Sequence, residues 1–187
     1  MAGAIVYFAA LPLQRASARR LLPLLMLLAV CPDLDYLGIW IFEVTFYPRF
    51  THSLMFTLGA ATSAWLAVWL SRRAAATPIL WAALTIAAVS HPALDLMVGA
   101  HSVPLLWPHE PADVSMPFGI LPSAGKLDAG NFYLWRNLAI EFGIFLPLLA
   151  IAAGVAHQLK RCILALMVLC ALPIFASSLA WAASLSR

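Results

Sequence analysis

Apolar residues run along this chain in long blocks that short polar or basic segments separate. Four blocks approach or exceed the about 20 residues that a helix needs to cross a membrane: 53–70, 78–100, 138–157 and 162–185. A further apolar region, 21–47, is interrupted by Pro32 and two aspartates. Because proline lacks a backbone donor and disfavours helix at the residue before it, we expect 21–47 to form a broken helix.

The first 13 residues are apolar but too short to span a membrane as a helix. Basic residues follow them between Arg15 and Arg20, whereas a secretory signal carries its basic residues first. We therefore expect a retained short membrane helix or re-entrant segment, and five or six membrane helices in a single domain over 1–187. The sizeable polar segment 101–137, rich in proline and glycine, is expected to be an extramembrane loop or lid.

Composition supports an all-α, polytopic integral membrane protein. Hydrophobic residues make up 64% of the chain and charged residues only 10%, with a mean hydropathy of +0.92. A soluble domain has about 25% charged residues, so this chain cannot cover a water-facing surface. The net charge of +3 comes from clusters at segment ends rather than a broad basic face, which argues against nucleic-acid binding.

The basic clusters also predict sidedness. If the four long blocks alternate in direction, all clusters fall on one face, which the positive-inside rule makes cytoplasmic. The clusters are Arg15, Arg19 and Arg20; Arg72 and Arg73; and Lys160 and Arg161. The polar side chains described next then belong to the extracytoplasmic side.

Three polar islands interrupt the apolar chain, at 31–35, 51–53 and 90–95. Carboxylates and imidazoles are costly near hydrocarbon unless they pair, line a wet cavity or bind a metal. We therefore predict a metal site. The five candidate ligands are Asp33, Asp35, His52, His91 and Asp95.

Spacing favours a common ion for these side chains. His91 and Asp95 are four positions apart and lie on one face of a helix. Asp33 and Asp35 converge only in a turn or extended segment, which the Pro32 break permits, and His52 adds a nitrogen. This donor set suits one or two divalent cations, with Zn²⁺ or Mn²⁺ favoured and Mg²⁺ a further choice.

Depth and residue type point to the chemistry. On a helix, His91 lies about 20 Å from Pro78, short of the about 30 Å of hydrocarbon, so the site is recessed and a lipid or lipid-linked substrate can reach it. No Gly-x-Ser-x-Gly elbow occurs, which favours metal-activated water over a serine nucleophile. We assign Asp95 or Glu141 as proton acceptor and Arg49 as a phosphate clamp, giving hydrolysis of a phosphoester.

Other interpretations use the same residues. Interhelical hydrogen bonds hold many polar side chains in membrane proteins, and proton relays or ion pathways contain the same residue types. A non-enzymatic metal-ion or proton carrier, or a scaffold, therefore remains the alternative. The sequence leaves the oligomeric state open.

Four sequence blocks resemble the YdjM-like family, described as LexA-regulated, membrane-bound, metal-dependent hydrolases of the bacterial inner membrane. The blocks are Pro32-Asp33-Leu34-Asp35, Phe50-Thr51-His52-Ser53-Leu54, Ser90-His91 with Asp95, and Val103-Pro104-Leu105-Leu106-Trp107-Pro108. The resemblance covers about 20–110 and implies that the five acidic and imidazole positions belong to a hydrolase site. A distant similarity to zinc-dependent phospholipase C would point to phosphoester cleavage. This chain departs from the family in having no histidine before His52 and Tyr47-Pro48-Arg49 in place of His-Arg-Gly.

Overall fold

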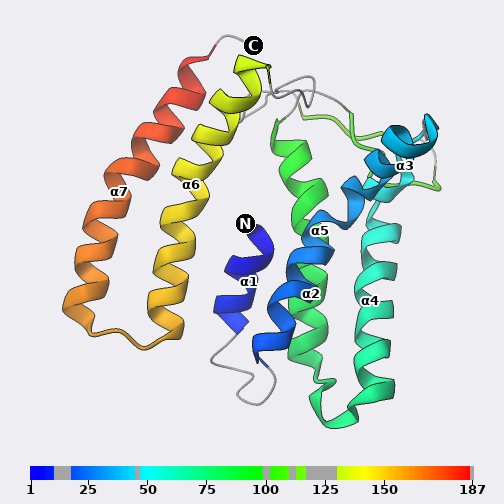
Figure 1. The fold of residues 1–187 in the computed structure, drawn as a ribbon, viewed down its shortest axis with the longest axis horizontal. Coiled ribbons are helices and arrows are strands. Elements are labelled where there is room, and N and C mark those ends of the chain that lie inside the picture. Colours follow the sequence, from blue (N-terminus) through cyan, green and yellow to red (C-terminus); the bar gives the residue numbers. More distant parts are fainter. Residues whose placement is uncertain (11–17, 45–46, 99–101, 110–112, 117–129, 186–187) are drawn as a thin grey trace.

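A computed structural model describes residues 1–10, 18–44, 47–98, 102–109, 113–116 and 130–185. Within these residues the chain is a bundle of helices that carries four segments long and apolar enough to cross a membrane (Figure 1). The four helices are α4 (Leu54–Ser71), α5 (Pro78–Val98), α6 (Phe132–Ala156) and α7 (Arg161–Ser184). The expected all-α, polytopic membrane fold is confirmed.

One boundary differs from expectation. Helix α6 begins at Phe132, so the last residues of the expected 101–137 loop are helical. The side chain of Asn131 accepts a hydrogen bond from the backbone N–H of Tyr133 at 3.0 Å and caps the helix. Arg136 and Asn137, whose polarity suggested a loop, therefore lie in the first turns of α6.

The region 21–47 is broken where the sequence predicts it. Helix α2 (Ala18–Val30) gives way to the 3-10 helix η2 (Cys31–Leu34), and α3 (Asp35–Phe42) follows. Pro32 lies in the first turn of η2. Backbone N–H groups in a first turn have no partner within the helix, so proline is tolerated there. The break, which carries Asp33 in η2 and Asp35 at the start of α3, leads into α3 at the upper end of the bundle in Figure 1.

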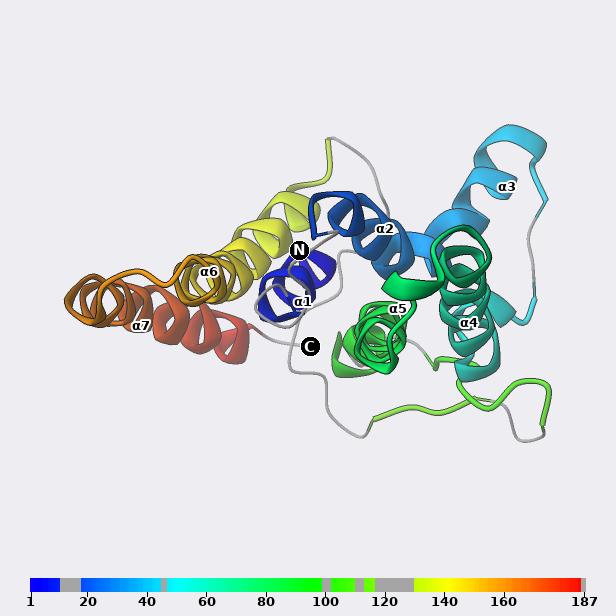
Figure 2. The same cartoon turned by 90° about the horizontal axis from the view of Figure 1, so that it is seen from below.

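The expected amino-terminal helix is α1 (Ala2–Ala10). It lies between α6 on one side and α2 and α5 on the other, as Figure 2 shows in the view from below. Gly3 brings α1 against the backbone of α2 at Leu25, too close for a side chain. This short helix thus joins the hairpin of α6 and α7 to the rest of the bundle.

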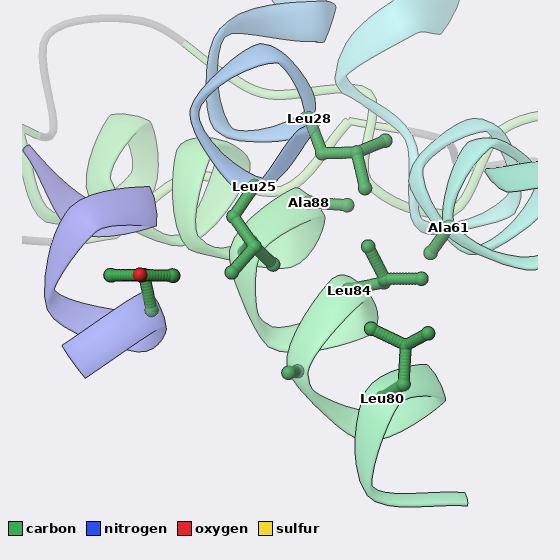
Figure 3. Packing of buried hydrophobic residues seen from close by; sticks show 9 residues of the cluster. Leu25, Leu28, Ala61, Leu80, Leu84 and Ala88 are labelled. Atoms are coloured by element: carbon green, nitrogen blue, oxygen red, sulfur yellow. The ribbon is translucent and has the colours of Figure 1, made fainter. Parts of the chain in front are cut away.

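The main apolar core lies between α1, α2, α4 and α5. Figure 3 shows Leu28 from α2 directed towards Leu84 and Ala88 of α5, with Ala61 of α4 nearby, and Leu25 of α2 belongs to the same buried cluster. A second cluster holds α6 to α7 through Ile140, Ile144 and Ala182. Burial of these side chains fixes α2, α4 and α5 next to one another, and these helices carry or flank the polar islands.

The basic turns lie together at the lower end of the bundle. In Figure 1 the turn between α4 and α5, with the 3-10 helix η4 (Arg73–Ala75), and the turn between α6 and α7 point the same way. The first residues of α2, which include Arg19 and Arg20, are also at this end, whereas Arg15 is outside the described residues. The described basic clusters therefore share one face of the bundle, and the polar islands lie at the opposite end.

Candidate metal centre

The three polar islands meet at the upper end of the bundle. Asp33 comes from η2, His52 from the 3-10 helix η3 (Phe50–His52) and His91 from α5, and one ligand atom of each lies within 4.8 Å of the others. Asp95, one turn after His91 on α5, directs Oδ2 to within 3.3 Å of His52 Nε2 and 3.6 Å of His91 Nε2. Four of the five predicted ligands are thus brought together.

The spacing of these atoms suits a cation. Asp33 Oδ1 lies 3.5 Å from His52 Nε2, and Asp33 Oδ2 lies 3.2 Å from His91 Nε2. A tetrahedral ion with bonds of about 2.0 to 2.1 Å holds its ligand atoms about 3.3 to 3.4 Å apart. The nitrogen-to-oxygen separations in the cluster, from 3.2 to 3.6 Å, bracket this value.

The backbone sets the orientation of His91. Its Nδ1 lies 3.0 Å from the carbonyl oxygen of Ala29 at the end of α2. A carbonyl oxygen only accepts hydrogen bonds, so Nδ1 must carry the proton. In the neutral ring Nε2 then offers a lone pair towards the carboxylates of Asp33 and Asp95, an arrangement that a cation between these atoms would stabilise.

His52 provides the clearest sign that the cluster fits a cation. Its side chain is only 3% exposed, and among the described residues its Nε2 makes no hydrogen bond, although two carboxylates are within 3.5 Å. The ring nitrogen therefore points between the acidic oxygens rather than at either of them. A buried polar atom left unsatisfied costs about 1 to 3 kcal/mol, and a cation between these groups would satisfy it. The residues present fit a divalent metal.

The segment that carries His52 is fixed on both sides. Ser53 is the N-cap of α4 and accepts a hydrogen bond from Phe56 N–H at 3.1 Å. The N–H of Leu54 donates to the carbonyl of Leu105 at 3.0 Å, which ties the 102–109 segment to the start of α4. Because Ser53 is fully buried and its oxygen caps a helix, it is poorly placed to act as a nucleophile.

Asp35 lies outside the group formed by Asp33, His52 and His91. Its carboxylate accepts two hydrogen bonds from Arg49, from Nε at 2.7 Å and from Nη2 at 2.9 Å. The side chain of Asp35 is 2% exposed, and it lies at the first turn of α3, directed at Arg49 rather than at the imidazoles. The sequence allowed Asp33 and Asp35 to converge, and in the structure they do so at the guanidinium of Arg49.

Arg49 links the two aspartates. Its Nη2 also reaches Asp33 Oδ1 at 3.3 Å, and its guanidinium lies 4.6 Å from the ring centre of Tyr36. Burial alone would lower the pKa of Arg49, but the carboxylate of Asp35 and the other charges nearby hold it above its usual value. The guanidinium therefore stays charged beside the proposed metal ligands.

Glu141 approaches from the other half of the bundle. It is partly buried on α6 and interacts electrostatically with the amino group of Met1 and with Asp95. Among the described residues no hydrogen bond or ion pair joins it to the cluster. It is therefore near the candidate ligands rather than one of them.

Two contributors were not anticipated from the sequence. Thr51 places Oγ1 at 3.1 Å from His52 Nδ1 and 3.4 Å from Asp35 Oδ2, and the Ala29 carbonyl holds His91. Thr51 precedes His52 directly in Phe-Thr-His-Ser, so a polar side chain beside the histidine was the available signal. The carbonyl of Ala29 has no sequence signature, because every residue carries one.

Comparison with known proteins gives one match. A family model described as YdjM inner membrane protein matches residues 1–183. No curated protein and no solved structure matches the chain. The match extends over nearly the whole chain, including both the helices of the candidate metal centre and the hairpin of α6 and α7.

Proposed function

Because the chain belongs to the YdjM inner membrane protein family, we propose that it is a membrane-bound, metal-dependent hydrolase that cleaves a phosphoester of a lipid or lipid-linked substrate. The observation that carries the proposal is the buried Nε2 of His52, which makes no hydrogen bond among the described residues and points between two acidic oxygens. A membrane location is supported by the four helices that are long and apolar enough to cross a membrane.

The proposed ligands are Asp33, His52, His91 and Asp95. Two imidazole nitrogens with two carboxylate oxygens form a borderline donor set, which favours Zn²⁺ or Mn²⁺ over Mg²⁺, since Mg²⁺ prefers oxygen alone. Asp35 was among the ligands that the sequence suggested. Its hydrogen bonds to Arg49 instead favour a supporting role, and the four remaining side chains are enough for one ion.

A bound divalent cation would polarise a phosphoryl oxygen and lower the pKa of an attacking water. Side chains of the protein would orient the phosphate and accept the proton from the attacking water. Arg49 uses Nε and Nη2 on the aspartates, which leaves Nη1 for a phosphate oxygen. Asp95 faces the imidazoles with Oδ2, so its Oδ1 or the carboxylate of Glu141 is proposed to accept the proton from water.

The position of the site supports a lipid substrate. Along α5, His91 is about 20 Å from Pro78 at 1.5 Å per residue, whereas the hydrocarbon layer is about 30 Å thick. A phosphate headgroup can reach such a depth while its acyl or prenyl tail stays in the bilayer. The basic turns at the opposite end favour a site on the extracytoplasmic side of the inner membrane, by the positive-inside rule.

The test is release of phosphate or headgroup from lipids in mixed micelles, such as phosphatidic acid or a polyprenyl phosphate. Zinc- or manganese-loaded protein should turn over the long-chain substrate, and this turnover should stop when a chelator is added. His91→Ala should abolish turnover, and His109→Ala, which changes an exposed histidine at the same end, should leave it intact. Arg49→Lys should reduce it less than His91→Ala, because lysine keeps the charge but not the paired geometry.

Short-chain analogues test the substrate class. If the tail positions the headgroup, analogues without it should lose turnover rate as well as affinity. No turnover of any lipid phosphoester by metal-loaded protein, or equal turnover in His91→Ala, would contradict the hydrolase and favour a carrier or scaffold.

A further inference from the structure

Asp35 and Thr51 form a chain of contacts that ends on His52. Asp35 Oδ2 lies 3.4 Å from Thr51 Oγ1, and Thr51 Oγ1 lies 3.1 Å from His52 Nδ1. All three residues are buried, with relative exposures between 3% and 8%. Water therefore has little access to these groups, and they must satisfy one another.

A threonine hydroxyl has a single proton, so the direction of this chain is restricted. The Asp35 carboxylate can only accept, and Arg49 already holds it in place with two hydrogen bonds. If Thr51 donates to Asp35, its oxygen accepts the proton on His52 Nδ1, and every contact in the chain is used. If Thr51 donates to Nδ1 instead, the contact with Asp35 is lost and the proton of the neutral ring moves to Nε2.

The second arrangement fails at the other end of the ring. A proton on Nε2 would find no hydrogen-bond acceptor with suitable geometry among the described residues, since Nε2 points between the carboxylates of Asp33 and Asp95. It would make no well-aligned hydrogen bond there, and it would block the lone pair that a metal needs. The first arrangement leaves that lone pair directed into the site.

We propose that Asp35 and Thr51 are positioning residues that hold His52 in the Nδ1-protonated tautomer, with Nε2 free to bind a divalent metal. The inference rests on the proposed metal site and adds to it a role for two residues that do not touch the ion. It also makes the two imidazoles equivalent, because the Ala29 carbonyl imposes the same tautomer on His91. Each ring thus has its outer nitrogen occupied and its inner nitrogen available.

The first experiment measures the tautomer directly. Long-range proton–nitrogen correlation spectra of metal-free, ¹⁵N-labelled protein in detergent distinguish a proton on Nδ1 from one on Nε2, with His52→Gln used to assign the signal. We expect Nδ1 to be protonated in the wild type. A wild-type His52 protonated at Nε2 and not at Nδ1 would overturn the proposal, and this result needs no metal and no change at Thr51.

The second experiment measures zinc affinity by competition with a chelator. Thr51→Val keeps the branched shape but removes the hydroxyl, and it should weaken zinc binding about 10- to 100-fold, whereas Thr51→Ser should bind close to wild type. Thr57→Val is the matched control, because Thr57 is also buried but, among the residues that the structure describes, its hydroxyl bonds to the backbone carbonyls of Ser53 and Leu54 and to no metal-ligand side chain. It should leave zinc affinity unchanged.

The outcomes separate the two proposals. Wild-type affinity in Thr51→Val, or a loss in Thr57→Val as large as in Thr51→Val, would overturn the positioning role while leaving the metal site intact. A wild type that binds no divalent metal would contradict the proposed function, and the tautomer of His52 would still decide whether Asp35 and Thr51 orient the ring.

Discussion

The Nδ1 atom of His91 lies 3.0 Å from the backbone carbonyl oxygen of Ala29, although 62 positions separate the two residues along the chain. The contact joins the middle of α5 to the end of α2, next to the break at Pro32. It fixes the ring so that the other nitrogen faces Asp33 and Asp95. The point at which the apolar helix breaks therefore also orients a candidate metal ligand.

Metal affinity should decrease as the pH is lowered. Imidazole binds a metal only when neutral, so protons compete with the metal and zinc binding should weaken as the pH falls. Chelator competition at pH 5.5 and 7.5 measures the change, with His109→Ala expected to follow the wild type. Equal affinity at both values would argue that the imidazoles of His52 and His91 are not ligands.

Packing of α1 on α2 should tolerate no added side chain at Gly3. A Cβ at this position would lie 2.5 Å from the carbonyl oxygen of Leu25, whereas a Cβ at Gly59 meets nothing within 4 Å. Gly3→Ala should therefore destabilise the detergent-solubilised protein by about 1 to 3 kcal/mol, and Gly59→Ala should have little effect or stabilise α4. Thermal unfolding of the two variants tests this, and equal melting temperatures would show that α1 does not pack as described.

Sidedness can be measured in intact cells. With Cys31, Cys162 and Cys170 replaced by alanine, Ser102→Cys, an exposed position beyond the carboxyl end of α5, should react with an impermeant thiol reagent, because the positive-inside rule places that end of α5 outside. Ser71→Cys, exposed at the lower end beside the basic turn, should react only after the cells are opened. The reverse pattern would place the candidate metal centre on the cytoplasmic side.

Much of the fold was predictable because membrane helices have a strong sequence signal. Length and uninterrupted hydropathy located α4, α5 and α7 closely, and Pro32 located the break between α2 and α3. The start of α6 was misplaced because Arg136 and Asn137 are polar, and a cap at Asn131 has only a local signature. Helical periodicity also predicted that His91 and Asp95 lie close together, because residues four positions apart are neighbours on one face of a helix.

The candidate site was predictable in residue type but not in pairing. Sequence spacing permits Asp33 and Asp35 to share an ion, and only the path of the chain after α3 shows that Arg49 takes the carboxylate of Asp35. The contacts of Thr51 and of the Ala29 carbonyl likewise depend on how η3, α2 and α5 meet. Such contacts are tertiary, and no local pattern in the chain specifies them.

The central claim is that Asp33, His52, His91 and Asp95 form one metal centre, and metal analysis of the protein purified in detergent without chelator tests it most directly. The wild type and the His109→Ala control should each retain about one zinc or manganese ion per chain, because two imidazoles and two carboxylates are enough protein ligands to hold one ion. His52→Ala and Asp33→Ala should each lose nearly all of it while remaining folded by circular dichroism. A metal content near zero in the wild type, or an unchanged content in both variants, would contradict the account.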